Sequence, residues 1–308
     1  MSSNTTKFEV LACTDLDKQS KVDNKHWKSL LIRGTFELDE SASRVSSGPS
    51  WDEPMELVSS LNFAGRGMEL SAMANFAGHI VAGDDQTGLL FKIDMQRRGV
   101  IPWVILATGD GEEIAMDRGF KVEWMTVKDG LLYVGSSGDS EMPVTLWVKT
   151  VTTQGEVRHL DWTQNWHKID AVLGLSLKQG LRIESVQWSD IHNRWFMLTK
   201  RAKPAEGGKK QAIRKIVIAD EEFQDFQVTE VEGPVDPDKC YTDMYFLPGS
   251  HDTIIVALQA TEIPKPGTKE SLFTSHLNIF TIGGVEILPP TEFSDNAKYE
   301  GIIVNKIE

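Results

Sequence analysis

The sequence predicts an all-β protein with the architecture of a five-bladed β-propeller, and three observations lead to this fold class. Short runs of Val, Ile, Leu, Phe, Tyr and Trp bounded by Gly, Asp, Asn and Pro dominate the chain, whereas amphipathic helical patterns are scarce. One strand–turn–strand pattern recurs about every 60 residues, which is in the range of a propeller blade. The chain has 308 residues, of which 40% are hydrophobic, and this length suits a closed β architecture or a repeat. We therefore expect a single domain over residues 1–308, with a flexible segment at residues 1–7.

Each copy of the repeat contains a polar residue at the head of a short strand, then a turn, then a strongly apolar strand. Four copies read MELSAMANFAGHIVAGDD (68–85), KVEWMTVKDGLLYVGSS (121–137), RIESVQWSDIHNRWFMLTK (182–200) and CYTDMYFLPGSHDTIIVALQ (240–259). The segments AG, KDG, SDIHN and PGSHD within them are typical of hairpin turns. A fifth copy is split between the termini, so that KYEGIIV (298–304) and FEVLACTD (8–15) are expected to pair and close the ring. Helices are expected only at Met55–Leu61 and Trp166–Leu175.

The heads of the five copies are predicted to converge on one axis, because the first strand of each propeller blade lies beside a central channel. Three carboxylates that meet in a narrow channel repel one another unless a cation lies among them. Carboxylate, hydroxyl and carbonyl oxygens in adaptable geometry are the ligands of Ca²⁺. A sandwich or a six-bladed ring in which each Glu is solvated at a strand entrance stays open as an alternative. The five heads are Ser71, Glu123, Glu184, Thr242 and Glu300.

Charge and composition exclude several classes of partner. The net charge of −13 disfavours nucleic acid and anionic membranes as main partners and is compatible with a bound cation. No run approaches the roughly 18 apolar residues of a membrane span. The two cysteines, Cys13 and Cys240, do not imply a disulfide framework. The N-terminal MSSNTTKFEV lacks the apolar core of a signal peptide.

Polar loops are expected beside the mouth of the channel, because the second strand of each blade returns to the face where the first begins. Carboxylates and cations beside a divalent ion suit phosphate handling, and solvated loops are the alternative interpretation. The segment GRGMELSAMANF (65–76) adds Arg66 and Glu69, two charges that need partners if they are buried. The loop residues are Asp15 and Asp17, Asp84 and Asp85, Ser136 and Ser137, and Lys200 and Arg201. The rest of the lysine-rich stretch 200–215 is expected to be solvated.

Ten segments stand in a characteristic order along the chain: GRGMELS (65–71), DDQTG (84–88), PWVIL (102–106), GDG (109–111), GFKVEW (119–124), LYVG (132–135), IESVQWSD (183–190), RWF (194–196), TIIVAL (253–258) and KYEG (298–301). This order resembles the calcium-activated nucleotidases, or apyrases, of vertebrate secretory compartments and arthropod saliva. The resemblance implies a five-bladed propeller with Ca²⁺ in the central channel that hydrolyses nucleoside di- and triphosphates and releases phosphate. The family's calcium positions fall on the five heads, with Thr242 in place of the usual Ser. An active-site Arg of the family falls on Lys200, and Arg201 beside it matches.

The resemblance implies a mechanism in which Arg66 and Lys200 or Arg201 stabilise charge on phosphate oxygens. Glu69 is expected to hold Arg66 or a metal-bound water, and a buried Arg66–Glu69 pair that fixes the turn is the alternative. Asp15 is the first candidate for the carboxylate that orients the attacking water, and Asp84 is the second. The tryptophans at 124, 147 and 188 are either stacking platforms for a base or core residues.

Two other functional classes stay open on the sequence alone. One is a non-catalytic, calcium-stabilised propeller that binds nucleotides or partner proteins. The other is a glycosidase, which needs a pair of carboxylates about 5 to 9.5 Å apart. UDP, GDP, ADP and ATP are unranked as substrates, and a homodimer is among the open oligomeric states. The resemblance suggests secretion or the lumen of the endoplasmic reticulum and Golgi, and the cytoplasm is expected if this N-terminus is native.

Overall fold

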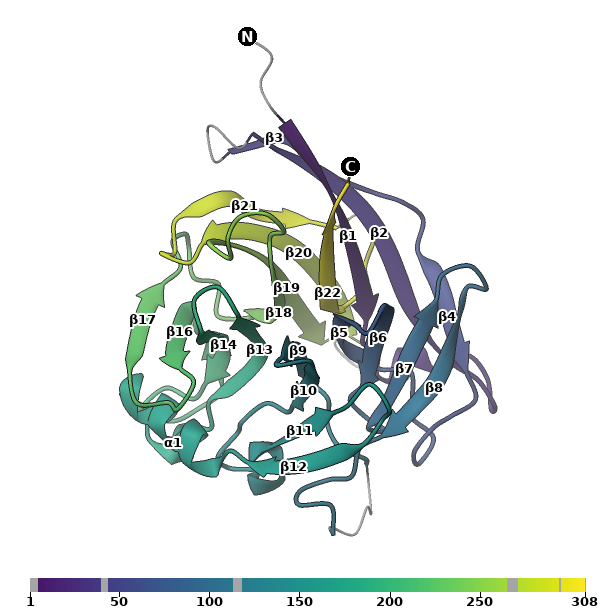
Figure 1. Cartoon of the computed structure of the whole chain (residues 1–308), viewed down its shortest axis with the longest axis horizontal. Coiled ribbons are helices and arrows are strands. Elements are labelled where there is room, and N and C mark those ends of the chain that lie inside the picture. Colours follow the sequence, from purple (N-terminus) through teal and green to yellow (C-terminus); the bar gives the residue numbers. More distant parts are fainter. Residues whose placement is uncertain (1–4, 40–43, 113–117, 265–270, 294, 308) are drawn as a thin grey trace.

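A computed structural model describes residues 5–39, 44–112, 118–264, 271–293 and 295–307 of the chain. The described residues form five antiparallel sheets that are arranged as blades around a common centre (Figure 1). The prediction of a five-bladed β-propeller is therefore confirmed.

Within each blade the strands follow one another from the centre outward. Blade 1 contains β22 (Tyr299–Lys306), β1 (Thr5–Thr14), β2 (Trp27–Asp39) and the outer strands β3 (Arg44–Trp51) and β4 (Met55–Ser59). Blade 2 contains β5 (Leu70–Phe76), β6 (His79–Asp84), β7 (Leu89–Asp94) and β8 (Gly99–Ile105). Blade 3 contains β9 (Trp124–Lys128), β10 (Leu131–Gly135), β11 (Trp147–Val151) and β12 (Val157–Asp161). Blade 4 contains β13 (Arg182–Ser189), β14 (Arg194–Ala202), β16 (Lys215–Asp220) and β17 (Phe226–Glu230), with β15 (Gln211–Ala212) paired to β14. Blade 5 contains β18 (Lys239–Phe246), β19 (Ile254–Pro264), β20 (Ser271–Thr281) and β21 (Glu286–Glu292).

The two ends of the chain close the ring, as the split fifth repeat predicts. Strand β22 pairs antiparallel with β1, and Val10 lies opposite Val304. Residues 5–7, which we expected to be flexible, are instead part of β1, because Thr5 pairs with Asp39 at the far end of β2. The remainder of the expected flexible segment lies outside the described residues.

The four predicted hairpin turns connect the first two strands of blades 2 to 5. Residues with positive φ stand in these turns, including Ala77 at 49° and Gly78 at 76°. Asp129 at 51° and Gly130 at 72° occupy the equivalent turn of blade 3. This is the backbone conformation that tight hairpin connections require, and it explains why Gly, Asn and Asp gather at these positions.

One of the two expected helices is a strand. Residues 55–59 form β4, which pairs with Trp27–Leu31 of β2. Met55 and Leu57 are buried while Glu56 and Val58 are exposed, so burial alternates with the period of a strand. The other expected helix is present as α1 (Thr163–Val172), which begins three residues earlier than predicted. Three short 3₁₀ turns complete the described elements: η1 (Asp17–Ser20), η2 (Pro143–Leu146) and η3 (Leu177–Gln179).

The apolar core is divided into five clusters, each between two neighbouring blades. For example, Val10 and Phe36 of blade 1 pack in one cluster with Val256 and Leu277 of blade 5. The cluster between blades 3 and 4 is rich in tryptophan, with Trp124, Trp162, Trp166, Trp188 and Trp195. The centre of the ring is thereby left to polar side chains.

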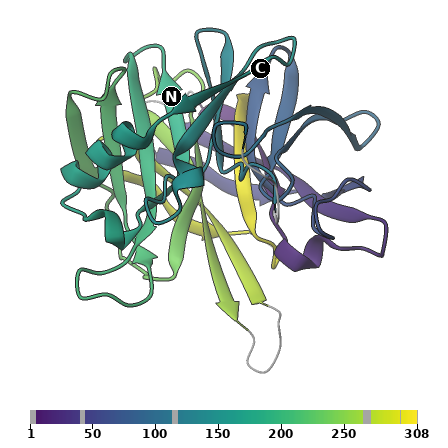
Figure 2. The same cartoon turned by 90° about the horizontal axis from the view of Figure 1, so that it is seen from below.

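One face of the propeller bears several projections. Figure 2 shows the β19–β20 hairpin extending from this face and η1 lying on the same side of the molecule. The described part of the chain contains no helix that is long and apolar enough to cross a membrane.

Candidate functional site

The five predicted head residues lie at the same structural feature of each blade, an irregularity in the pairing of the innermost strand. In blade 2, Leu70 pairs with Asp84 and Ala72 with Gly83, so that Ser71 is left without a partner on β6. A β-bulge of this kind places one extra residue on one strand and redirects its side chain.

The same bulge recurs in the other blades. Thr242 is the unpaired residue of β18, and Glu300 is the unpaired residue of β22. In β13, Glu184 lies in a shift between Ile183 and Val186. Glu123 precedes β9, and its N–H donates to the carbonyl of Gly135 at 2.8 Å although Trp124 is the residue paired with Gly135. Four register shifts and the segment before β9 thus bring five oxygen-bearing side chains, all buried, to the centre of the ring.

Direct contacts join members of this group across blades. The Ser71 hydroxyl donates to Glu300 Oε2 at 3.0 Å, and the Thr242 hydroxyl donates to the carbonyl of Tyr299 at 3.1 Å. Lys200 pairs with Glu184 and lies 3.6 Å from Glu300 Oε1. We call the five head residues the central ring: Ser71, Glu123, Glu184, Thr242 and Glu300.

The carboxylates of the central ring have strongly perturbed pKa values. Burial and the neighbouring charge of Glu184 raise the pKa of Glu123 to about 8. Burial also raises the pKa of Glu300 to about 7, although Lys298 and Lys200 act against this. For Glu184, burial opposes ionisation, but Lys200 and Lys121 hold its pKa at about 2. Three buried acids with two hydroxyls match the donor set of Ca²⁺, and a cation there would favour the ionised carboxylates that burial disfavours.

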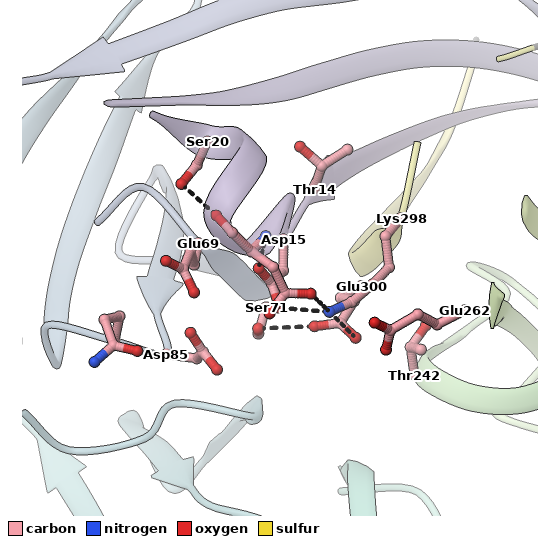
Figure 3. Close-up of polar contacts among 12 residues, drawn as sticks. Thr14, Asp15, Ser20, Glu69, Ser71, Asp85, Thr242, Glu262, Lys298 and Glu300 are labelled. Carbon is pink, nitrogen blue, oxygen red and sulfur yellow. Dashed lines mark hydrogen bonds and ion pairs between the residues drawn. The ribbon is translucent and has the colours of Figure 1, made fainter. Parts of the chain in front are cut away.

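A second acidic group lies beside the central ring. One carboxylate oxygen from each of Asp15, Glu69 and Asp85 falls within 4.8 Å of the others, and all three residues are buried. Figure 3 shows Glu69 and Asp85 facing the same space, with Asp15 next to Lys298. Asp85 Oδ1 has no hydrogen-bond partner among the described residues, although it is buried. We call these three residues the acidic triad.

The two charged residues of the GRGMELS segment, Arg66 and Glu69, are partners of one another. Arg66 Nε donates to Glu69 Oε1 at 2.8 Å, its Nη2 pairs with the other oxygen of Glu69, and Nη2 also lies 3.3 Å from Asp17 Oδ1. The Arg66 side chain keeps 32% of its surface exposed, whereas that of Glu69 is fully buried. Burial and the charges of Asp15 and Asp85 raise the pKa of Glu69 to about 8, against the effect of Arg66. The pairing fixes the turn and still leaves the guanidinium facing the mouth.

Asp84 and Asp85 have different environments although they are adjacent. The Asp84 carboxylate accepts the backbone N–H groups of Met68 at 2.7 Å and Gln86 at 2.9 Å. It therefore holds the loop that follows β6, while the Asp85 carboxylate lies in the acidic triad and contacts Lys121. The structure brings Asp15, Arg66 and Glu69 together with Asp85, and it places the Asp84 carboxylate away from them.

A cavity of about 210 Å³ opens beside the central ring between blades 4 and 5. Lys200 and Arg201 line it, as do Lys209 and Lys210 from the stretch that we expected to be solvated. Lys210 is only 14% exposed and pairs with Asp139 at 2.5 Å. Arg201 Nε has no hydrogen-bond partner within the described parts of the chain. Cationic side chains outnumber acidic ones in this lining, so the cavity suits an anion.

The tryptophans considered as stacking platforms do not line this cavity. Trp124 and Trp188 belong to the core between blades 3 and 4, and the Trp124 indole N–H donates to the carbonyl of Ser136 at 2.9 Å. Trp147 lies at the start of β11, in an outer part of blade 3.

Two lysines that were not predicted from the sequence lie between the central ring and the acidic triad. Lys121 contacts Asp85 Oδ2 at 2.5 Å and also pairs with Glu123. Lys298 contacts Asp15 Oδ2 at 2.7 Å and lies 3.5 Å from Glu300 Oε1. A signal for them exists in the sequence, because each lysine stands two residues before a ring glutamate.

The chain is similar to known proteins over almost its whole length. The family model described as Apyrase matches residues 16–304. The chain is 34% identical to "Apyrase" of Cimex lectularius, over 96% of this chain and 82% of that protein. It is also 34% identical to "Soluble calcium-activated nucleotidase 1" of Rattus norvegicus, over 96% of this chain and 73% of that protein. "Apyrase apy-1" of Caenorhabditis elegans is 34% identical, over 96% of this chain and 84% of that protein.

Proposed function

This chain belongs to the apyrase family, and from that premise we propose how its propeller binds calcium and acts on nucleotides. The protein is a hydrolase of nucleoside di- and triphosphates, and Ca²⁺ is its activating ion. The observation that supports a particular site is the irregular pairing of the innermost strands, which leaves Ser71, Thr242 and Glu300 unpaired and buried at the centre of the ring. We assign the calcium ion to this central ring.

The donor set of the central ring fits the ion. Three carboxylates neutralise a divalent charge, and the hydroxyls of Ser71 and Thr242 complete an oxygen-only environment of adaptable size. When bound, Ca²⁺ supplies positive charge close to the phosphate group that reacts. Magnesium suits this environment poorly, because it requires a smaller and stricter octahedron.

The phosphate chain of the nucleotide is assigned to the cationic cavity. Lys200 and Arg201 come from β14 at its inner edge, and Lys209 and Lys210 lie further along its wall. Arg66 approaches from the side of the acidic triad with part of its guanidinium exposed. These groups hold and neutralise phosphate oxygens, as phosphoryl transfer requires positioning and charge stabilisation more than covalent chemistry.

The attacking water is assigned to the acidic triad. Asp15 accepts the N–H of Asp17 at 2.7 Å through one oxygen and Lys298 through the other, so both of its oxygens are engaged. Asp85 Oδ1 is the free buried acceptor, and it can accept a hydrogen bond from water. The oxygen of that water forms a bond to the terminal phosphorus while its proton passes to Asp85. The bond from phosphorus to the bridging oxygen breaks, so that the shortened nucleotide is the leaving group and the terminal group is released as inorganic phosphate. We therefore give the role first considered for Asp15 or Asp84 to Asp85, with Asp15 as its neighbour in the triad.

The test is phosphate release from UDP, GDP, ADP and ATP in the presence of Ca²⁺, Mg²⁺ or a chelator. We expect release with Ca²⁺, little with Mg²⁺ and none with the chelator. Full activity in Mg²⁺ after calcium has been chelated would contradict the assignment of the ring to calcium. Tight Ca²⁺ and nucleotide binding without phosphate release would favour the non-catalytic propeller. A homodimer also stays a proposal, and light scattering on the same samples tests it.

A further inference from the structure

Each carboxylate of the central ring forms an ion pair with a lysine. Glu123 pairs with Lys121 and Glu184 with Lys200. Glu300 has two lysines near one oxygen, Lys298 at 3.5 Å and Lys200 at 3.6 Å from Oε1. Its other oxygen accepts the Ser71 hydroxyl.

These pairs compete with a cation in the ring. A dication bound by the same carboxylate oxygens takes the acceptors that the ammonium groups use. It also repels those groups over a few ångströms in a poorly screened interior. A lysine that leaves the ring must then find another anion, because an unpaired buried ammonium is costly.

Lys298 has such an anion-binding space beside it. It lines the cationic cavity together with Lys200 and Arg201, and 12% of its side chain is exposed there. The same ammonium group contacts Asp15 Oδ2 at 2.7 Å and Asp17 Oδ2 at 3.0 Å, and these contacts keep it paired beside the cavity when the longer contact to Glu300 is lost. A short movement of the ammonium group, from the ring toward the cavity, exchanges a carboxylate oxygen for a phosphate oxygen.

We propose that Lys298 is a further phosphate-contacting residue of this enzyme, and that filling the central ring with calcium frees it from Glu300 for this role. The inference rests on the proposed function, because it takes the ring as the calcium site and the cavity as the phosphate site. Calcium and the phosphate chain are then linked through a shared lysine, and each increases the affinity of the other by the same factor. This linkage gives a physical reason for activation by calcium.

The experiment measures two affinities by calorimetry in wild type and in Lys298→Met. The first is the affinity for Ca²⁺ without nucleotide. The second is the affinity for adenosine 5′-(α,β-methylene)diphosphate, which is not hydrolysed, at saturating Ca²⁺ and in chelator. In Lys298→Met we expect tighter Ca²⁺ binding, because a competing cation is gone. We expect analogue binding in Ca²⁺ to weaken by about tenfold or more, the usual size for a charged hydrogen bond, and to change little in chelator.

Lys209→Met is the matched control. Lys209 lines the same cavity, is 75% exposed, and pairs with Asp238 at 2.8 Å, away from the ring. This variant should weaken analogue binding by the same factor with and without Ca²⁺ and leave Ca²⁺ affinity unchanged. If Lys298→Met does not fold, as judged by circular dichroism, Lys298→Gln serves for the same measurements, and Lys298→Arg should restore analogue binding.

Weaker Ca²⁺ binding in the folded Lys298 variants would overturn the inference, because it would mean that the lysine only supports the shape of the ring. Unchanged analogue affinity at saturating Ca²⁺ would overturn it as well. A failure of the proposed function is distinguished from these outcomes, because the wild-type protein would then show no calcium-dependent release of phosphate.

Discussion

At the scale of the residue, the site is defined by which buried oxygens have partners. Asp84 and Asp85 follow one another in the chain, yet the first is saturated by backbone N–H groups and the second has a free oxygen beside two other acids. The same residue type therefore supports a loop at one position and can meet a water at the next. Substitution of each aspartate separates these roles.

We predict that Asp85→Asn lowers kcat/KM for nucleoside diphosphates by about a hundredfold or more, because it removes the charge of the carboxylate assigned to the water. Thermal stability should change little, because the amide oxygen can still accept a hydrogen bond from Lys121. Asp84→Asn should instead destabilise the fold by about 1 to 3 kcal/mol. Both Asp84 oxygens accept backbone N–H groups, and an amide would set its own N–H against one of them. Phosphate release and urea unfolding measure the two effects. Equal activity loss in the two variants, with equal stability, would contradict the assignment.

The ring glutamates make a second prediction at this scale. Glu123→Gln, Glu184→Gln and Glu300→Gln should each weaken Ca²⁺ binding by at least about tenfold, because each removes a negative charge from the donor set, while the β fold is retained. Calorimetry measures the affinity for Ca²⁺, and circular dichroism measures whether the β fold is retained. Glu222→Gln, on an exposed turn, is the control and should leave the affinity unchanged. Wild-type affinity in all three ring variants would place the ion elsewhere.

At the scale of the element, the bulges of the innermost strands convert a regular sheet edge into a set of convergent ligands. The bulge at Glu300 lies where β22 passes closest to blade 2. Gly301 follows it, and a Cβ at this position would lie 2.8 Å from the backbone of Ala72 and 2.8 Å from Cys13 Sγ. A glycine is required at this position because backbone, and not a flexible side chain, fills the space.

We predict that Gly301→Ala destabilises the protein by about 1 to 3 kcal/mol, the usual range for overpacking a core, and weakens Ca²⁺ binding through displacement of Glu300. Denaturant unfolding and calcium titration test both parts. Gly48→Ala is the matched control, because Gly48 lies on β3 with nothing within 4 Å of a Cβ and should tolerate the methyl group. A neutral result for Gly301→Ala would mean that β22 moves away from blade 2 without loss.

At the scale of the whole molecule, five apolar interfaces between blades enclose a centre filled with buried charges. Acids from β22, β13 and the segment before β9 meet there with lysines from three blades. The pairing of β22 with β1 closes the ring. The stability of the fold is therefore linked to the state of its central carboxylates.

The pH dependence of stability follows from this linkage. The pKa values of Glu123 and Glu300 are raised to about 8 and about 7 in the folded protein, so between about pH 5 and 8 the folded state binds more protons than the unfolded state. In chelator, the free energy of unfolding attributable to these groups should fall as pH rises through this range. Calcium should reduce the fall, because it favours the ionised acids. Thermal unfolding at several pH values, with Ca²⁺ and with chelator, measures this, and identical profiles in both conditions would speak against a ring-bound ion.

The sequence by itself determined the fold class, the five repeats and the five head residues, because turn chemistry and strand periodicity are local properties that recur once per blade. It also indicated the closure of the ring by the two termini, since the split repeat leaves each terminal strand without a partner. The charged loop residues also led to the prediction that Asp15, Arg66 and Glu69 lie at one mouth of the channel, and the structure brings these three residues together.

Only the tertiary structure decided which of the neighbouring charged residues face the site and which segments form outer strands. Met55–Ser59 is a strand because β2 offers it a paired edge, which no local propensity reveals. Asp85 instead of Asp84 joins the acidic triad because backbone N–H groups of Met68 and Gln86 engage the Asp84 carboxylate. Lys121 and Lys298 contact ring glutamates from the segments just before β9 and β22. Lys209 and Lys210, far from the head residues in sequence, line the cavity, where Lys209 pairs with Asp238 and Lys210 with Asp139. Each of these outcomes depends on contacts between segments that are far apart in the sequence. Local sequence patterns do not specify such contacts.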